Sequence, residues 1–415
     1  HLQDELFWET AARAGKRVCV LNPLLSTPQP LTGLTLVPPT PCPAQDIQTP
    51  LPTQGTRTPL PAEAFPALLD EPLIPPSSQL LTFCTTLQER TERQVGTALD
   101  LLAREPWDLF FLQLDALDHV QHFLWRYSDP GDPMYPGKNE HANRILEFYQ
   151  LFDKIVGRFR AAIQGSECVL GVVSSHGHER RCVYRLHVNE WLREQQFLLS
   201  ADQARVHKGR GKPGWLEQTR LRDCFAWLVQ RLPWVQGGAS KRHSIDPQHT
   251  IAQLVELASA TSSYGGITIN RGLLEREQRN YDLVCEAIVT GLERLSLKEN
   301  PVVNWARRRE QCYQGKYLER YPDILFELRG DFGVGRSLYT PLIIPDSTHR
   351  LISGTHSSHG VFLLENWPEE LEVYEDFQYP SVMDVAPTIL HLLSVEHAGL
   401  DGQALVQPRQ VRQLI

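Results

Sequence analysis

The first candidate site is a short segment that places two metal-binding residue types four positions apart. Asp118 and His122 follow the apolar run DLFFLQL, residues 108–114. On the first turn of a helix, this spacing puts a carboxylate and an imidazole on one face, where both can bind one cation. The combination suits Zn²⁺ or Mn²⁺. The same residues also fit a solvated helix start in which an aspartate caps the helix.

Two further segments place histidines beside predicted strands. His176, in SSHGH, follows the apolar run 167–173, and His356, in GTHSSHG, precedes the run 360–364. Each histidine alone could simply bond the backbone of its own glycine-containing turn. Three such clusters next to core strands favour one shared site over three unrelated turns, because ligands of α/β proteins gather at one edge of the sheet. We therefore expect the clusters to converge.

The elements that must position these residues alternate along the chain. A helix is expected over residues 5–14 and another over about 139–160. The predicted strands are residues 17–21, 108–114, 167–173, 323–328 and 360–364. Their hydrophobicity is continuous rather than alternating, which is typical of strands covered on both faces. Strands separated by helices predict an α/β fold with a mainly parallel sheet between helical layers.

Composition limits the classes of function. The chain has 415 residues, of which 41% are apolar and 22% charged, so we expect a folded protein with two or three domains or an insertion. Its net charge of −8 argues against binding to a nucleic acid polymer or an anionic membrane. Its eight cysteines form no CxxC pair, which favours reduced thiols and a cytoplasmic protein over a disulfide framework.

The middle of the chain differs from the predicted sheet segments. We expect residues 201–300 to form an inserted cap on a core made of residues 1–200 and 301–415. Lys208, Arg210 and Lys212 of the cap could close over a phosphate, or they could lie in a solvated loop.

The ordered motifs resemble the alkaline phosphatase superfamily, in the branch of type I phosphodiesterases and nucleotide pyrophosphatases. This resemblance implies a three-layer α/β/α sandwich. It rests on FWETAARAGKRVCVLNPL (7–24), DHVQHFLWRYSDP (118–130), VVSSHGH (172–178), HVNEWLREQQFL (187–198), YGGITIN (264–270), EQCYQGKYLERYPDILFEL (310–328), SGTHSSHG (353–360) and DVAPTILHLLSVEHAGLDGQAL (384–405).

The resemblance also implies a site with two metal ions and a covalent Thr or Ser nucleophile. Its first metal would be held by Asp118, His122 and His356, in preference to the neighbouring Asp115 and His119. The second site is degenerate. His176 is present, but Ser175 stands where the family has an aspartate. An early aspartate and the nucleophile are expected upstream of His1, together with the first strand of the sheet.

These departures predict one firmly bound metal, Zn²⁺ or alternatively Mn²⁺, instead of two. Two cations usually clamp the attacking and leaving oxygens of a phosphoryl group, and a serine and one imidazole would hold the second cation weakly. His178 and His359 could replace lost ligands or donate protons, or they could be ordinary polar loop residues.

The leading hypothesis is a cytoplasmic metal-dependent phosphohydrolase of the phosphodiesterase type, impaired in this form. Its substrate would be a phosphate mono- or diester, either nucleotide-like or a small phosphorylated metabolite. The alternative is a non-catalytic pseudoenzyme that keeps one metal and binds a phosphorylated ligand or a protein partner. A sulfatase or phosphoglycerate mutase relative fits less well, since the sequence lacks the Cys-x-Pro-x-Arg context of sulfatases.

Overall fold

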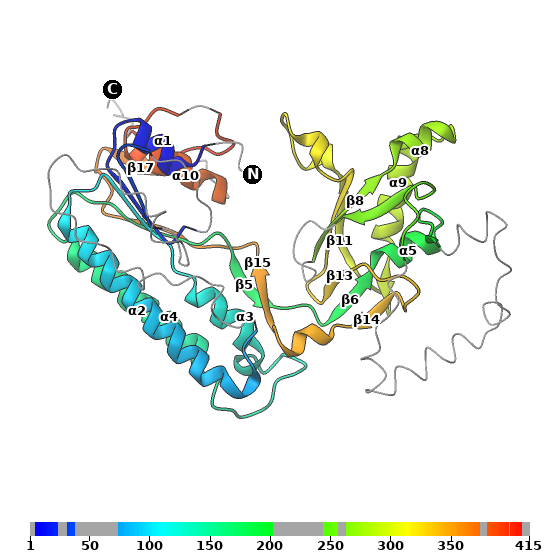
Figure 1. Ribbon diagram of the computed structural model, residues 1–415, viewed down its shortest axis with the longest axis horizontal. Coiled ribbons are helices and arrows are strands. Elements are labelled where there is room, and N and C mark those ends of the chain that lie inside the picture. The colour runs from blue at the N-terminus through cyan, green and yellow to red at the C-terminus, as the bar shows by residue number, and fades with distance from the viewer. Residues whose placement is uncertain are drawn as a thin grey trace, which may run out of the picture. The chain divides into compact units, whose positions relative to one another are not determined.

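The computed structural model divides into two compact units (Figure 1). Unit 1 comprises His1–Arg180 and Leu351–Ile415, and unit 2 comprises Arg181–Arg350. Unit 2 therefore contains the predicted insert 201–300 and extends beyond it on both sides, while a capping role for the insert stays a prediction. The structure describes residues 5–23, 31–37, 74–201, 244–255, 263–373, 380–397 and 399–408.

Unit 1 contains a parallel sheet in the order β2–β1–β3. All four residues of its central strand are buried, as the continuous apolar run predicts. The remaining strands of the unit pair antiparallel as β5–β15, β4–β16 and β17–β18. The strands are β1 (Val18–Leu21), β2 (Leu34–Val37), β3 (Leu109–Leu112), β4 (Leu170–Val173), β5 (Gly177–Arg180), β15 (Gly354–Ser357), β16 (Phe362–Glu365), β17 (Leu371–Val373) and β18 (Val406–Pro408).

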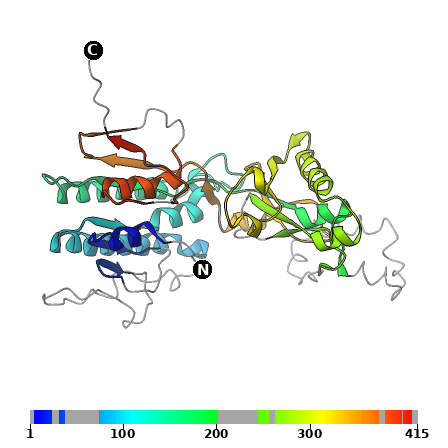
Figure 2. The ribbon, with the colours of Figure 1, turned by 90° about the horizontal axis from the view of Figure 1, so that it is seen from above.

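Two long helices of unit 1 lie along each other and carry a core of their own. Figures 1 and 2 both show α2 and α4 side by side. The buried positions of α2 recur every three or four residues, which gives one apolar face. The shorter α3 packs its own apolar face into the same core. The helices are α1 (Phe7–Arg13), α2 (Leu80–Arg104), α3 (Ala116–Ser128), α4 (Arg144–Ala162) and α10 (Val385–Leu392).

Unit 2 has a separate core built on an antiparallel sheet in the order β11–β12–β8–β7 and a mixed sheet β13–β6–β14. Its helices are α5 (Val188–Glu194), α8 (Arg271–Arg276) and α9 (Tyr281–Glu293). Its strands are β6 (Tyr184–His187), β7 (Ala252–Val255), β8 (Tyr264–Ile269), β9 (Ser296–Leu297), β10 (Asn300–Pro301), β11 (Val303–Arg308), β12 (Ile324–Leu328), β13 (Phe332–Gly335) and β14 (Ile343–Pro345).

The predicted α/β class is confirmed, but two strand partners differ from the expectation of one parallel sheet. The run 323–328 becomes β12, in the antiparallel sheet of unit 2, and the run 360–364 becomes β16, antiparallel to β4. The physical reason is that a continuous apolar run reports coverage of both faces and not the direction of the neighbouring strand.

Two further sequence observations can be compared with the structure. None of the described helices is both long and apolar enough to cross a membrane. The cysteines at positions 19, 84, 168, 182, 285 and 312 are free thiols, whereas Cys42 and Cys224 lie outside the described residues.

Candidate metal centre

Three histidines share one face of the two-stranded ribbon formed by β5 and β15. The antiparallel register places His178 directly opposite His356. Directly opposite residues of an antiparallel pair point to the same side, and residues two apart in an extended chain do so as well. His176 therefore joins them from the position just before β5. The sequence HGH contains this alternation already.

Helix α3 contributes the other two side chains. Asp118 lies in its first turn, and His122 lies one turn further along. The opposite face of the helix carries Val120 and Leu124, which are fully buried in the core shared with α2 and α4. Burial of this apolar face fixes the rotation of α3 about its axis, so the polar pair faces the ribbon.

Backbone contacts hold the ribbon against α3. The Ser353 amide donates to the His122 carbonyl (2.9 Å), and the Arg126 amide donates to the Ser353 hydroxyl (3.0 Å). At Gly354 the approach is so close that a Cβ would lie 2.2 Å from the Gln121 carbonyl oxygen. Glycine is therefore required where β15 crosses the helix, and it lets the ribbon reach the metal-binding face.

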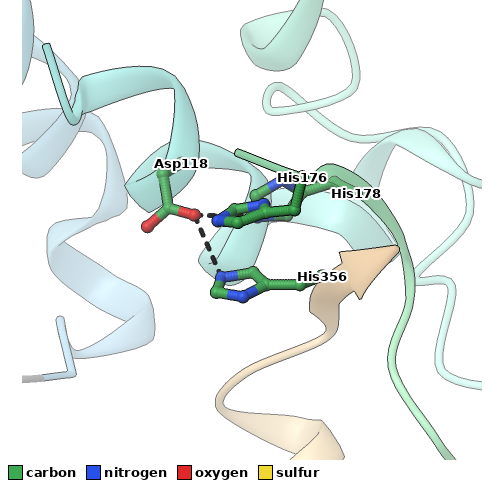
Figure 3. A group of neighbouring side chains, drawn as sticks. All are labelled: Asp118, His176, His178 and His356. Atoms are coloured by element: carbon green, nitrogen blue, oxygen red, sulfur yellow. Dashed lines mark ion pairs between the residues drawn. The ribbon is translucent and has the colours of Figure 1, made fainter. Parts of the chain in front are cut away.

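The ligand atoms gather around one carboxylate oxygen of Asp118. Its Oδ1 lies 3.1 Å from His178 Nε2 and 3.2 Å from His356 Nε2 (Figure 3). It also lies 3.5 Å from His122 Nε2. The Nε2 atoms of His122 and His356 are 3.0 Å apart. With zinc–nitrogen bonds of about 2.0–2.1 Å, the ligand atoms of a tetrahedral site are about 3.3 Å apart. The observed spacings match that geometry.

The orientation of these atoms also fits a cation. Asp118 Oδ1 and His178 Nε2 are buried and close, yet within the described part of the chain neither has an aligned hydrogen-bond partner. Buried polar atoms normally have a hydrogen-bond partner. His122 donates from Nδ1 to the Gly354 carbonyl (3.0 Å), which leaves its Nε2 lone pair directed at the cluster. Such a carbonyl contact orients metal-bound histidines.

The charge states suit a metal site as well. Burial raises the pKa of Asp118, but the imidazoles of His178 and His356 lower it further, so the net pKa lies well below its ordinary value. Burial also lowers the pKa of His122 and of His176. An ionised carboxylate and neutral imidazoles are the forms that bind metals.

The other predicted site residues have different surroundings. His176 stacks on His356, with ring centroids 3.6 Å apart and planes at 14°. Ser175 is exposed in the bend between β4 and β5, and His359 is exposed in the loop after β15. The second metal site therefore stays a prediction. Lys208, Arg210 and Lys212 lie outside the described residues.

The neighbouring acidic residue of the motif has a separate role. Asp115 pairs with the buried Arg90 of α2 at 2.7 Å. Among the described residues, one group of three or more metal-ligand types gathers closely, and it consists of Asp118, His176, His178 and His356. The preference for Asp118 over Asp115 as a metal ligand stays a prediction.

In this α/β chain, one carboxylate and several imidazoles converge at the two-stranded ribbon. This arrangement makes the chain a candidate metalloprotein. The sequence profile described as type I phosphodiesterase / nucleotide pyrophosphatase matches residues 1–359. The chain belongs to this family. No curated protein sequence matches it.

Solved structures give remote likenesses. Phosphonoacetate hydrolase from Sinorhizobium meliloti 1021 is 13% identical over 74% of this chain and 56% of its own, with a TM-score of 0.37. Human ectonucleotide pyrophosphatase / phosphodiesterase 5 is 12% identical over 95% of this chain and 72% of its own, with a TM-score of 0.43. The chain thus spans little more than half the length of the hydrolase, and the family match carries the conclusion.

Proposed function

We propose that this chain is a metal-dependent phosphohydrolase of the phosphodiesterase type. Family membership supplies the class of reaction, and the convergence of Asp118, His122 and His356 is the observation that carries the proposal. One carboxylate with several imidazoles favours Zn²⁺, with Mn²⁺ as the alternative. The proposed substrate is a phosphate mono- or diester, either nucleotide-like or a small phosphorylated metabolite.

The residues of the cluster divide the work of binding. When bound, a divalent ion would polarise a phosphoryl oxygen. Asp118 supplies the negative charge that holds the cation, and the Gly354 carbonyl fixes the ring of His122. The His356 side chain is 51% exposed, whereas that of His178 is 4% exposed. A phosphate ester would therefore approach from the His356 side of the cluster, where His359 is a candidate proton donor.

A specific observation favours a second candidate, a non-catalytic relative that binds a phosphorylated ligand or a protein partner. The gathered group of ligands contains a single carboxylate, and Ser175 at the expected aspartate position is exposed. A second cation has little to hold it there, although two-metal displacement depends on both ions.

The proposal extends to location and partners. We propose a cytoplasmic protein that acts on small molecules, without a nucleic acid polymer or a membrane as partner. The net charge of −8 and the free thiols support this part.

The test combines metal analysis with hydrolysis assays on the full chain. After loading with Zn²⁺ or Mn²⁺, we expect one bound ion per chain and metal-dependent hydrolysis of nitrophenyl phosphate esters. Asp118→Asn should lower metal affinity at least about 100-fold, because loss of even a supporting contact costs up to about that much. Asp153→Asn, an exposed site on α4, is the matched control and should bind normally.

The outcomes separate the two candidates. Metal binding without hydrolysis of any phosphate ester would favour the non-catalytic relative. Failure of the wild-type chain to bind either metal would overturn both.

A further inference from the structure

We propose that His178 is a fourth protein ligand of the ion held by Asp118, His122 and His356. The protein itself would then fill all four positions of a tetrahedral site. This inference rests on the metal site of the proposed function and specifies how that site is closed.

The first observation is the placement of His178 between the ribbon and α3. Strand β5 packs against this helix, and the His178 side chain is 4% exposed, less than the side chains of Asp118, His122 and His356. Its Nε2 lies 3.1 Å from Asp118 Oδ1, which is the shortest distance from that oxygen to any of the three imidazoles paired with it.

The second observation is that His178 Nε2 and Asp118 Oδ1, although 3.1 Å apart, are not aligned as a hydrogen bond. Both atoms are buried, and in the described parts of the structure neither has an aligned partner. A buried polar atom without a partner costs about 1–3 kcal/mol, so the arrangement needs another source of stabilisation. A cation between the two atoms supplies it, because both lone pairs would then be used.

Burial also argues against the alternative role of proton donor. A donor must recover its proton from solvent, and the His178 side chain has almost no access to it. His359 is exposed and remains available for that role.

The remaining imidazole, His176, belongs to the same close group, but its orientation suits an ion bound by His356 less well than that of His178. Its ring lies nearly parallel to that of His356, with centroids 3.6 Å apart. The lone pair of an imidazole nitrogen lies in the ring plane, so two stacked rings cannot both point at one ion. With His356 as a ligand, His176 lies beside the coordination shell, and His178 completes it.

A closed set of ligands has a chemical consequence. Structural zinc sites are closed by four protein ligands, whereas catalytic sites keep a position for water or substrate. The resting ion would therefore have no free position for a phosphate oxygen, so the hydrolysis of the proposed function would require one of the four ligands to move away. Removal of His178 would open such a position.

Cobalt absorption on the full chain tests this inference, because the visible bands of Co²⁺ report its ligands independently of activity. We expect a four-coordinate spectrum from the wild-type chain that inorganic phosphate leaves unchanged. His178→Ala should bind Co²⁺ about 100-fold more weakly, and its spectrum should change when phosphate is added. Added imidazole should restore the original bands. His249→Ala, an exposed histidine of unit 2 outside the cluster, should bind Co²⁺ like the wild type.

Each outcome decides one question. His178→Gln repeats the test with a side chain of similar size, and circular dichroism verifies that both variants fold. Wild-type affinity and spectrum in the folded variants would overturn the role of His178, as would a wild-type spectrum that shifts with phosphate. Absence of Co²⁺ binding by the wild-type chain would instead overturn the metal site of the proposed function.

Discussion

The buried carboxylates of the two units are surrounded in opposite ways. In unit 2, Asp323 accepts hydrogen bonds from the Ile269 amide (2.7 Å), the Tyr281 hydroxyl (2.8 Å) and the Arg271 guanidinium (3.2 Å). In unit 1, Asp118 has imidazole nitrogens at similar distances, but none is aligned with its buried Oδ1 as a hydrogen-bond donor.

The difference separates a structural charge from a candidate binding group. The donors around Asp323 satisfy its lone pairs, so this carboxylate joins β8, α9 and the segment before β12. Asp118 is surrounded by imidazole nitrogens, each of which offers a lone pair in one of its two neutral tautomers, and such a set can bind a cation. Burial alone would not have distinguished the two.

The largest expected effect comes from Asp323→Asn. The substitution removes the charge that faces Arg271 and replaces one acceptor by a donor, so we expect a loss of about 3 kcal/mol in the free energy of unfolding of unit 2. Urea denaturation followed by hydrogen exchange of unit 2 amides measures it. Metal affinity at Asp118 should not change.

Asp282→Asn is the control for that substitution. Asp282 is 70% exposed and pairs with Arg308, so its loss should cost less than about 1 kcal/mol. Equal losses from both substitutions would contradict the structural role of Asp323.

Gly354→Ala should have an intermediate effect on unit 1. Its Cβ would lie 2.2 Å from the backbone oxygen of Gln121, so β15 must move away from α3. We expect a destabilisation of about 2 kcal/mol and metal affinity lowered about tenfold, measured by thermal unfolding and metal titration. Gly157→Ala on α4 meets no atom within 4 Å and should leave both quantities unchanged or slightly raise stability. Unaltered metal binding in Gly354→Ala would argue against the close fit of ribbon and helix.

The smallest expected effect is a pH dependence in unit 2. Burial, aided by the positive charge of Arg185, lowers the pKa of His187 to about 4. Between the ordinary histidine pKa of about 6.5 and pH 4, the unfolded chain binds a proton that the folded chain does not, so stability falls as pH falls. The contribution approaches about 1.4 kcal/mol per pH unit, so within any one pH unit it is smaller than the effects of Asp323→Asn and Gly354→Ala.

His187→Asn isolates this contribution. The Ser337 amide donates to His187 Nδ1 (3.1 Å), and an asparagine oxygen can replace that acceptor without titrating. Urea denaturation at pH 7, 6 and 5 should show a shallower decline for the variant. Parallel declines would mean that His187 does not cause the dependence.

The sequence predicted several of the strands and helices and the meeting of their ends, but not helix α2 or the strands β5 and β15. The runs 17–21 and 108–114 are strands because their apolar residues are continuous, and the structure has β1 and β3 there. Asp118 follows one predicted apolar run and His356 precedes another, which is why their convergence was predictable from position alone. Their role as metal ligands stays a prediction.

Pairing between distant segments was not predictable. The HGH alternation places His176 and His178 on one face, but their position opposite His356 depends on the register of β5 with β15. The closeness of His178 to Asp118 depends further on the rotation of α3 in its core. Neither property is local to a stretch of sequence, so His178 could only be named as one of several alternatives.

The register of the ribbon has a consequence for the way unit 2 is inserted into the chain. Arg180 and Gly354 are paired residues of neighbouring antiparallel strands, and all of Arg181–Arg350 is connected between them. A domain inserted at the open end of a hairpin can be exchanged or shortened while the hairpin persists, since a brief turn joins the same two strands. The four proposed ligands all lie in unit 1, so we expect a chain in which a short turn replaces Arg181–Arg350 to keep the metal-binding ribbon.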